Sequence, residues 1–164
     1  MFQIALISSP DNFAGEHEML EQMFEKGLQT LYARKPQMPD ALLERWLLGF
    51  NFKWHDKILP WPGSAHSFEE LEKTNSEIRF LSPVFDSISK HGYKAKYSKE
   101  ELREGIAAWK KTHQQKLFAL GGVEASNIAE LAELGFSGAA VLGAVWHSFD
   151  PVGACEEILN LHQG

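Results

Sequence analysis

Residues 117–146 read LFALGGVEASNIAELAELGFSGAAVLGAVW, and this stretch is the most informative about the fold. An apolar run ends in two glycines, a helical pattern follows, and a second apolar run ends in a third glycine, Gly143. A strand, a helix and a strand in this order predict a parallel α/β unit. Glycine at a strand end costs backbone entropy on folding, so we expect another group to approach the main chain at both places.

The same alternation runs along the rest of the chain. Capping-box patterns, Ser67 with Glu70 and Ser98 with Glu101, mark two helix starts. Short apolar runs typical of buried strands occur at residues 4–8, 28–33, 57–59, 64–66, 78–84, 116–120 and 138–142. Strands that alternate with helices predict an α/β fold with a parallel sheet, and this number of strands favours a (β/α)8 TIM barrel.

One interval is too short for a complete barrel. Only the four residues PWPG, 60–63, separate two predicted strands, whereas a parallel crossover needs about a dozen residues or more. We therefore expect a single barrel domain over residues 1–164 that lacks one or more β/α units between about residues 59 and 64. We attribute this to residues missing from the sequence and predict a spatial break near residues 59–63. A continuous chain there would instead favour metal-free functions.

Composition and charge limit the partners. The 164 residues have a formal net charge of −6 and no basic stripe, which argues against nucleic acids and anionic membranes. No segment reaches the length of a membrane span, and the N-terminus lacks the basic start of a signal peptide. The single cysteine, Cys155, lies in a helical pattern and is expected in the core. One cysteine fits a reducing cytoplasm, which is the expected location.

The glycines that end the last two strands predict an anion site. Ligands of parallel α/β folds bind at the carboxyl ends of the strands. Gly121 and Gly122 end one predicted strand, and Gly143 and Ala144 follow the next. Without Cβ atoms the N–H groups of two neighbouring loops can converge on one phosphate, and a helix that starts at Gly143 adds partial positive charge. A purely structural turn is the alternative for each glycine.

Three motifs, in this order, resemble the thiamine phosphate synthase/TenI superfamily. They are GSAHSFEEL at residues 63–71, FLSPVFDSISKHG at 80–92 and the stretch 117–146. The resemblance implies a (β/α)8 barrel. It implies either a synthase, which joins hydroxymethylpyrimidine diphosphate to thiazole phosphate and releases pyrophosphate, or a TenI enzyme, which aromatises thiazole phosphate by proton transfer. The implied partners are small phosphorylated heterocycles, with magnesium (Mg²⁺) as the synthase cofactor, and homo-oligomeric assembly stays open.

The resemblance also implies roles for single residues. Gly121, Gly122 and Gly143 would hold the thiazole phosphate. His66 matches the general base of TenI enzymes, a role that suits imidazole because its unperturbed pKa lies near neutrality. Without the resemblance, His66 would be interpreted as a structural histidine and Lys90 as a solvated loop lysine. The implied catalytic residues are His66 and Lys90, and the implied substrate-binding residues are Arg34, Lys35, Ser64, Ser87 and Ser89.

The sequence departs from the synthase pattern in two respects. The glutamine and lysine that flank the strand-end arginine in synthases are replaced by Tyr32 and Pro36. The synthase metal ligands have no counterpart, because they would fall in the missing segment. His55 and Asp56 precede the strand at 57–59 and so lie at its wrong end, and the HEMLE motif at His17 lacks the second histidine of a zinc helix.

Three functions follow from these observations. The first is a transferase that forms thiamine phosphate with Mg²⁺ at the leaving diphosphate. The second is a TenI-type isomerase, for which His66 and the phosphate site suffice. The third is a non-catalytic module that binds a phosphorylated ligand on an incomplete barrel or a flavodoxin-like fold. The DSISK stretch at 86–90 favours the synthase, which we place first, whereas Tyr32 and Pro36 favour the isomerase.

Overall fold

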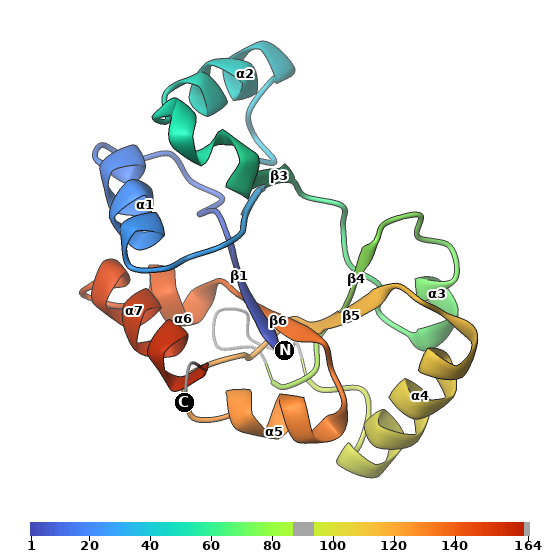
Figure 1. Cartoon of the computed structure of the whole chain (residues 1–164). Helices are drawn as coiled ribbons and strands as arrows, with labels where there is room; N and C mark the ends of the chain where they lie inside the picture. The colour runs from blue at the N-terminus through green and yellow to red at the C-terminus, as the bar shows by residue number, and fades with distance from the viewer. Residues whose placement is uncertain (87–93, 163–164) are drawn as a thin grey trace.

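A computed structural model describes residues 1–86 and 94–162 of the chain. Within this part, six parallel strands form one curled sheet, and the helices lie around its outer face (Figure 1). The strand order is β3-β2-β1-β6-β5-β4. The strands are β1 (Gln3–Ile7), β2 (Leu31–Ala33), β3 (Ile58–Pro60), β4 (Ile78–Leu81), β5 (Lys116–Ala119) and β6 (Gly138–Val141). The predicted parallel α/β architecture is confirmed.

Helices connect most of the successive strands. They are α1 (Glu16–Glu25), α2 (Asp40–Leu48), the 3-10 helix η1 (Phe52–Lys57), α3 (Phe68–Leu71), α4 (Lys99–Thr112), α5 (Ile128–Leu134), α6 (Gly143–Trp146) and α7 (Pro151–His162). The capping box predicted at the start of α4 is present, because the Ser98 side chain accepts from the Glu101 N–H and the Glu101 carboxylate accepts from the Ser98 N–H. Both bonds satisfy N–H groups that a helix start leaves without an intrahelical partner.

The barrel is open between β3 and β4. These strands follow one another in the sequence but form the two edges of the sheet, and no ladder joins them in the described part of the chain. The sheet is therefore a half-barrel of six strands, and a complete eight-unit barrel is not formed. The predicted strand at residues 64–66 is reduced to one bridge, in which Ala65 pairs with Leu81.

The chain is continuous across this opening. Trp61, directly after β3, donates its N–H to the carbonyl of Ala33 at 3.3 Å, and the chain then reaches Ala65 on the β4 edge. The predicted break at residues 59–63 is therefore wrong. The crossover length on which it rested applies to strands that pair side by side, and β3 and β4 do not pair.

Aromatic side chains fill the interior of the half-barrel. The ring of Phe80, on β4, lies 5.2 Å from that of Tyr32 on β2 and 4.8 Å from that of Trp61, measured between centroids. Phe118, on β5, lies 5.7 Å from Phe80. We call these four residues the interior aromatic cluster. Aromatic pairs at such distances contribute about 0.5–1.5 kcal/mol each beyond the area they bury. The cluster joins the two sheet edges by side-chain packing where backbone hydrogen bonds are lacking.

The main core lies between the sheet and the helices. It includes Leu20 and Met23 of α1 and Leu131 of α5, all without exposed surface. Cys155 on α7 is buried there, as predicted, and burial raises the pKa of its thiol to about 12. Since the thiolate is the reactive form, this cysteine is inert packing at neutral pH.

Candidate functional site

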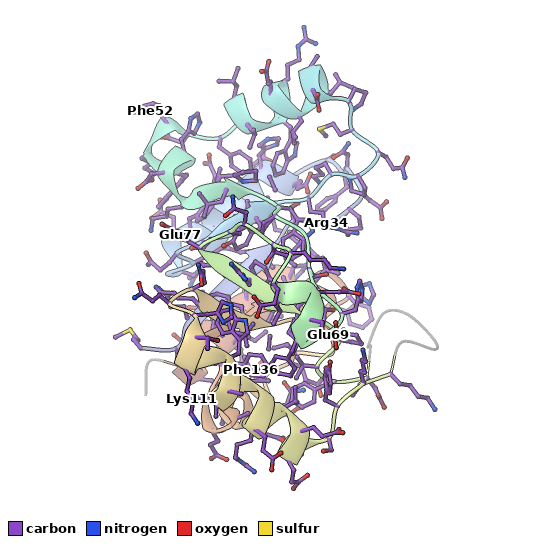
Figure 2. All side chains as sticks on the ribbon, turned by 90° about the vertical axis from the view of Figure 1, so that its right-hand side faces the viewer. Arg34, Phe52, Glu69, Glu77, Lys111 and Phe136 are labelled. Carbon is purple, nitrogen blue, oxygen red and sulfur yellow. The ribbon has the colours of Figure 1, made fainter. Side chains whose placement is uncertain are left out.

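A cavity of about 570 Å³ opens at the carboxyl ends of the strands. In the side view of Figure 2, Arg34 and Glu69 lie toward one end of the sheet, and Glu77, which precedes β4, lies toward the other. The described residues that line the cavity are Ile7, Ser9, Pro10, Asp11, Arg34, Trp61, Ser64, His66, Ser82, Pro83, Leu120, Gly121, Leu142, Trp146 and His147. Four predicted site residues, Arg34, Ser64, His66 and Gly121, therefore come together in one place.

Arg34 lies at the cavity because Ser8 fixes its main chain. Ser8, directly after β1, is fully buried. Its hydroxyl accepts the Arg34 N–H at 2.8 Å and donates to the Arg34 carbonyl at 3.0 Å. The two bonds continue the pairing of β1 with β2 beyond the strand ends, and they hold the main chain that carries the Arg34 side chain in place. A guanidinium presents its donors in a planar fork that matches phosphate oxygens.

Lys35, the next residue, does not reach the cavity. Its ammonium is fully buried in an ion pair with Glu16 and donates to the Asp11 carbonyl at 2.9 Å. It lies 4.9 Å from the ring centroid of Trp46, whose indole N–H donates to the other Glu16 oxygen at 3.1 Å. Lys35 therefore holds the loop after β1 in place and is not available to a substrate in the cavity.

His66 lies at the rim, with Glu70 of α3 beside its ring. Ser67 accepts the Glu70 N–H at 3.1 Å, as the capping pattern predicted. The Glu70 carboxylate, however, accepts the backbone N–H of His66 at 2.7 Å and lies 3.3 Å from its Nδ1. These contacts, with the backbone bond as the largest cause, lower the pKa of the Glu70 carboxyl. If Nδ1 donates to this carboxylate, Nε2 is the free acceptor, which is the arrangement a general base needs.

The two glycines after β5 have a structural reason as well. Gly121 and Gly122 have φ of +92° and +67°, a region that favours glycine. A Cβ on Gly121 would lie 2.8 Å from Pro83 Cα, and one on Gly122 would lie 2.7 Å from Phe85 Cβ. The group that approaches the main chain here is the loop after β4. The N–H groups of both glycines have no partner among the described residues.

Gly143 and Ala144, the first residues of α6, line a neighbouring hollow of about 400 Å³. Ser126, Glu124 and Glu157 also line it, from the loop after β5 and from α7. The described residues that line the hollow are Glu124, Ala125, Ser126, Gly143, Ala144, His147, Ser148, Ala154, Glu157 and Ile158. The predicted phosphate residues are thus divided between two adjoining spaces, with Gly121 in the cavity and Gly143 in the hollow.

Several residues of the site were not predicted from the sequence. Trp146 lines the cavity, and its indole N–H donates to the Ile7 carbonyl at 2.8 Å, which fixes the ring. His147 lines both spaces. Glu70 was visible only as a helix cap, and Ser8 only as the end of a strand. Three predicted residues, Ser87, Ser89 and Lys90, lie outside the residues that the structure describes.

The described residues do not form a site for Mg²⁺. No group of three or more His, Cys, Asp or Glu side chains in this part of the chain could hold a metal ion. Asp11 is the one acidic residue among the described residues that line the cavity. The other candidates are engaged elsewhere, because His17 Nε2 lies 2.7 Å from the Trp46 carbonyl and His55 Nε2 lies 3.0 Å from the Phe50 carbonyl. In the described residues, no helix is both long and apolar enough to cross a membrane.

Two curated relatives are thiamine-phosphate synthases. The protein of Vibrio campbellii is 31% identical over 124 residues, which are 74% of this chain and 55% of the relative. The protein of Prochlorococcus marinus is 30% identical over 112 residues, which are 65% of this chain and 30% of the relative. The chain thus spans about half or less of the curated relatives it matches. No family model matches the chain.

Solved structures extend the comparison to nearly the whole chain. The thiamine phosphate pyrophosphorylase of Bacteroides thetaiotaomicron superposes with a TM-score of 0.79 at 28% identity, over 99% of this chain and 98% of that one. The pyrophosphorylase of Pyrococcus furiosus has the same fold, with a TM-score of 0.68 at 19% identity over 99% and 96% of the two chains. By sequence and by fold, the chain belongs to the thiamine phosphate synthase/TenI-like family.

Proposed function

We propose that this chain joins hydroxymethylpyrimidine diphosphate to thiazole phosphate, with release of pyrophosphate, in thiamine biosynthesis. The observation that carries the proposal is that Arg34, His66 and Gly121 line one cavity at the carboxyl ends of the strands. The relatives that bear the name thiamine-phosphate synthase support the same activity.

The residues of the cavity suit two phosphorylated rings. In the reaction the bond between the pyrimidine methylene carbon and its diphosphate breaks, and pyrophosphate leaves with the electron pair. The thiazole ring nitrogen supplies the electron pair for the new carbon–nitrogen bond. Groups that bind its oxygens more strongly as this charge develops lower the barrier. Arg34 is our candidate for that role, and the family resemblance assigns Lys90 to the same diphosphate. The side chains of Trp61 and Trp146 line the cavity and provide apolar surface for planar rings.

The thiazole phosphate is assigned to the glycine loops. The N–H groups of Gly121 and Gly122, which have no partner in the described part of the chain, are neutral donors for phosphate oxygens, as are the first N–H groups of α6 at Gly143 and Ala144. Since the described residues do not fit a Mg²⁺ site, charge neutralisation falls to the side chains of Arg34 and Lys90 in this proposal.

A TenI-type isomerase is the second candidate, and the contact between His66 and Glu70 favours it. An imidazole whose Nδ1 donates to a carboxylate keeps Nε2 free to take a proton from a thiazole phosphate in the cavity. This activity needs no metal. The chain is continuous at residues 60–64, and the described residues contain no group that could hold a metal ion, which also favours this activity.

One assay separates the candidates. The purified chain is mixed with both phosphorylated substrates, with and without Mg²⁺, and pyrophosphate release and thiamine phosphate are measured. A parallel sample receives the non-aromatic thiazole phosphate tautomer alone. We expect coupling, with the KM of the diphosphate raised about tenfold or more in Arg34→Ala and partly restored in Arg34→Lys.

The variant His66→Ala distinguishes the two chemistries. Loss of isomerisation with coupling retained would identify His66 as a base used only in the isomerase reaction. If the wild-type chain catalyses neither reaction but still binds thiazole phosphate, both catalytic proposals fail and the chain is a binding module.

A further inference from the structure

Of the described residues that line the two spaces, His147 alone belongs to both. It directly follows α6 and lines both the central cavity and the hollow beside Gly143 and Ala144. Among the described residues its imidazole forms no hydrogen bond, ion pair or ring contact, and the residue is exposed. Its backbone N–H donates to the Gly143 carbonyl at 3.0 Å, which ties the residue to the glycine at the start of α6.

The carboxylates that line the hollow would repel a phosphate, so a phosphate bound there requires a positively charged partner. Glu124 and Glu157 line it, from the loop after β5 and from α7. Glu124 keeps its carboxylate near the loop, where the Ser126 hydroxyl donates to it at 2.8 Å. A phosphate dianion held between two carboxylates is repelled by both, and neutral N–H donors alone do not cancel a net charge. Of the described residues that line the hollow, only His147 can become positive.

We propose that His147, when protonated, binds the phosphate group of the ligand at the junction of the cavity and the hollow. The inference rests on the proposed function, because it assigns a further binding residue to the same phosphorylated substrate. The ligand class is a phosphate monoester dianion. Its ring would lie in the cavity, and its phosphate would meet the imidazolium and the N–H groups of Gly143 and Ala144.

The proposal predicts a pH dependence with a definite sign. An imidazolium forms a charge-assisted hydrogen bond with an anion, whereas the neutral ring contributes no charge. Affinity for the anion is therefore highest where the imidazole carries its second proton, and it falls as rising pH removes that proton. The other charged groups that face the two spaces are Glu124, Glu157, Asp11, Arg34 and His66. Between pH 5.5 and 8 ordinary carboxylates and guanidinium groups keep their charge, whereas the charge of an ordinary imidazole changes.

The test uses inorganic sulfate, which stays a dianion over this range, so any pH dependence belongs to the protein. Binding is measured by calorimetry at pH 5.5 and pH 8 for the wild-type chain, His147→Asn and the matched variant His66→Asn. We expect sulfate to bind about tenfold more tightly to the wild type at pH 5.5, the effect of one charge-assisted hydrogen bond. His147→Asn should lose most of that difference, and His66→Asn should keep it.

Three other outcomes of the sulfate experiment would contradict the inference. A pH difference that survives in His147→Asn or disappears in His66→Asn would overturn the inference, as would a wild type that binds no sulfate at pH 5.5. Circular dichroism of each variant checks that it is folded. If sulfate behaves as expected but the coupling and isomerisation assays are both negative, the proposed function fails while the role of His147 in anion binding stands.

Discussion

Gly122 combines two constraints at a single residue. Its φ of +67° strains any residue with a Cβ, and the loop after β4 lies against the position that the Cβ would occupy, with the Asp86 carbonyl and Phe85 as neighbours. Gly63 has a similar φ of +88° but nothing within 4 Å of its Cβ position. A substitution at Gly63 therefore introduces backbone strain alone, whereas one at Gly122 introduces backbone strain and a steric clash.

We predict that Gly122→Ala destabilises the chain at least twice as much as Gly63→Ala. The second substitution costs only the left-handed strain, about 1 kcal/mol, whereas the first also pushes the loop after β4 away. Urea unfolding of both variants measures the difference. Equal losses would mean that the loop yields without cost.

Arg34 and Lys35 show why the residues of the site could be predicted only in part. Arg34 and Lys35 are neighbours just after β2, and successive side chains of an extended chain point to opposite faces. Arg34 therefore meets the cavity, and Lys35 turns toward Glu16 and Trp46. Family resemblance places residues by position in the sequence, but the ion pair that captures Lys35 is formed by segments that meet only in the folded chain.

At the scale of a single element, α3 shows how a helix start can serve a site. Ser67 caps the helix, but the carboxylate of Glu70 turns to the residue before the cap, His66. The lowered pKa of Glu70 means that its contribution is present above the pKa of the unfolded carboxyl and is lost as pH falls through the folded value.

We predict that His66→Ala leaves the pKa of Glu70 below its ordinary value. The largest cause of the shift is the backbone N–H of residue 66, which the substitution keeps, and the ring contributes less. An NMR titration of the Glu70 carboxyl in both proteins checks this. A return of the pKa to the ordinary glutamate value in the variant would show that the imidazole is the main partner.

Elements were predicted best where they are long and periodic. The buried stripe of α4 and the strands β5 and β6 lie where the pattern indicated. The predicted strand at residues 28–33 begins only at Leu31, because Leu28 still belongs to the turn after α1, where its N–H donates to the Met23 carbonyl at 3.0 Å. The short helix η1 was not predicted, since it is built by local turns that carry no amphipathic period.

For the molecule as a whole, the interior aromatic cluster decides whether the half-barrel holds together. Tyr32, where synthases have glutamine, is buried in this cluster, and burial raises the pKa of its hydroxyl. No composition or spacing could indicate this, because the need for a large ring at that position arises only once β3 and β4 fail to pair.

We predict that Phe80→Ala costs about 3–5 kcal/mol in the free energy of unfolding and loosens the two sheet edges selectively. Phe80 contacts Tyr32, Trp61 and Phe118, so its loss removes the packing across the opening. Hydrogen exchange of the β3 and β4 amides should accelerate more than exchange in β6.

Phe136→Ala is the matched control, because Phe136 is equally buried but belongs to the core between the sheet and the helices. It should lower global stability without a preference for β3. If both variants accelerate exchange equally in all strands, the cluster has no special role in joining the edges.

The opening between β3 and β4 makes this fold modular. The five strand pairs of the described sheet, β3 with β2, β2 with β1, β1 with β6, β6 with β5 and β5 with β4, keep their registers independently of the residues that link Pro60 to Ala65. Whole β/α units can therefore be inserted or deleted at the opening between β3 and β4 without changing the other hydrogen-bonded strand pairs. Chains of different length in one family can share the same ligand-binding half, and a protein engineer could graft a new lobe here next to a preformed cavity.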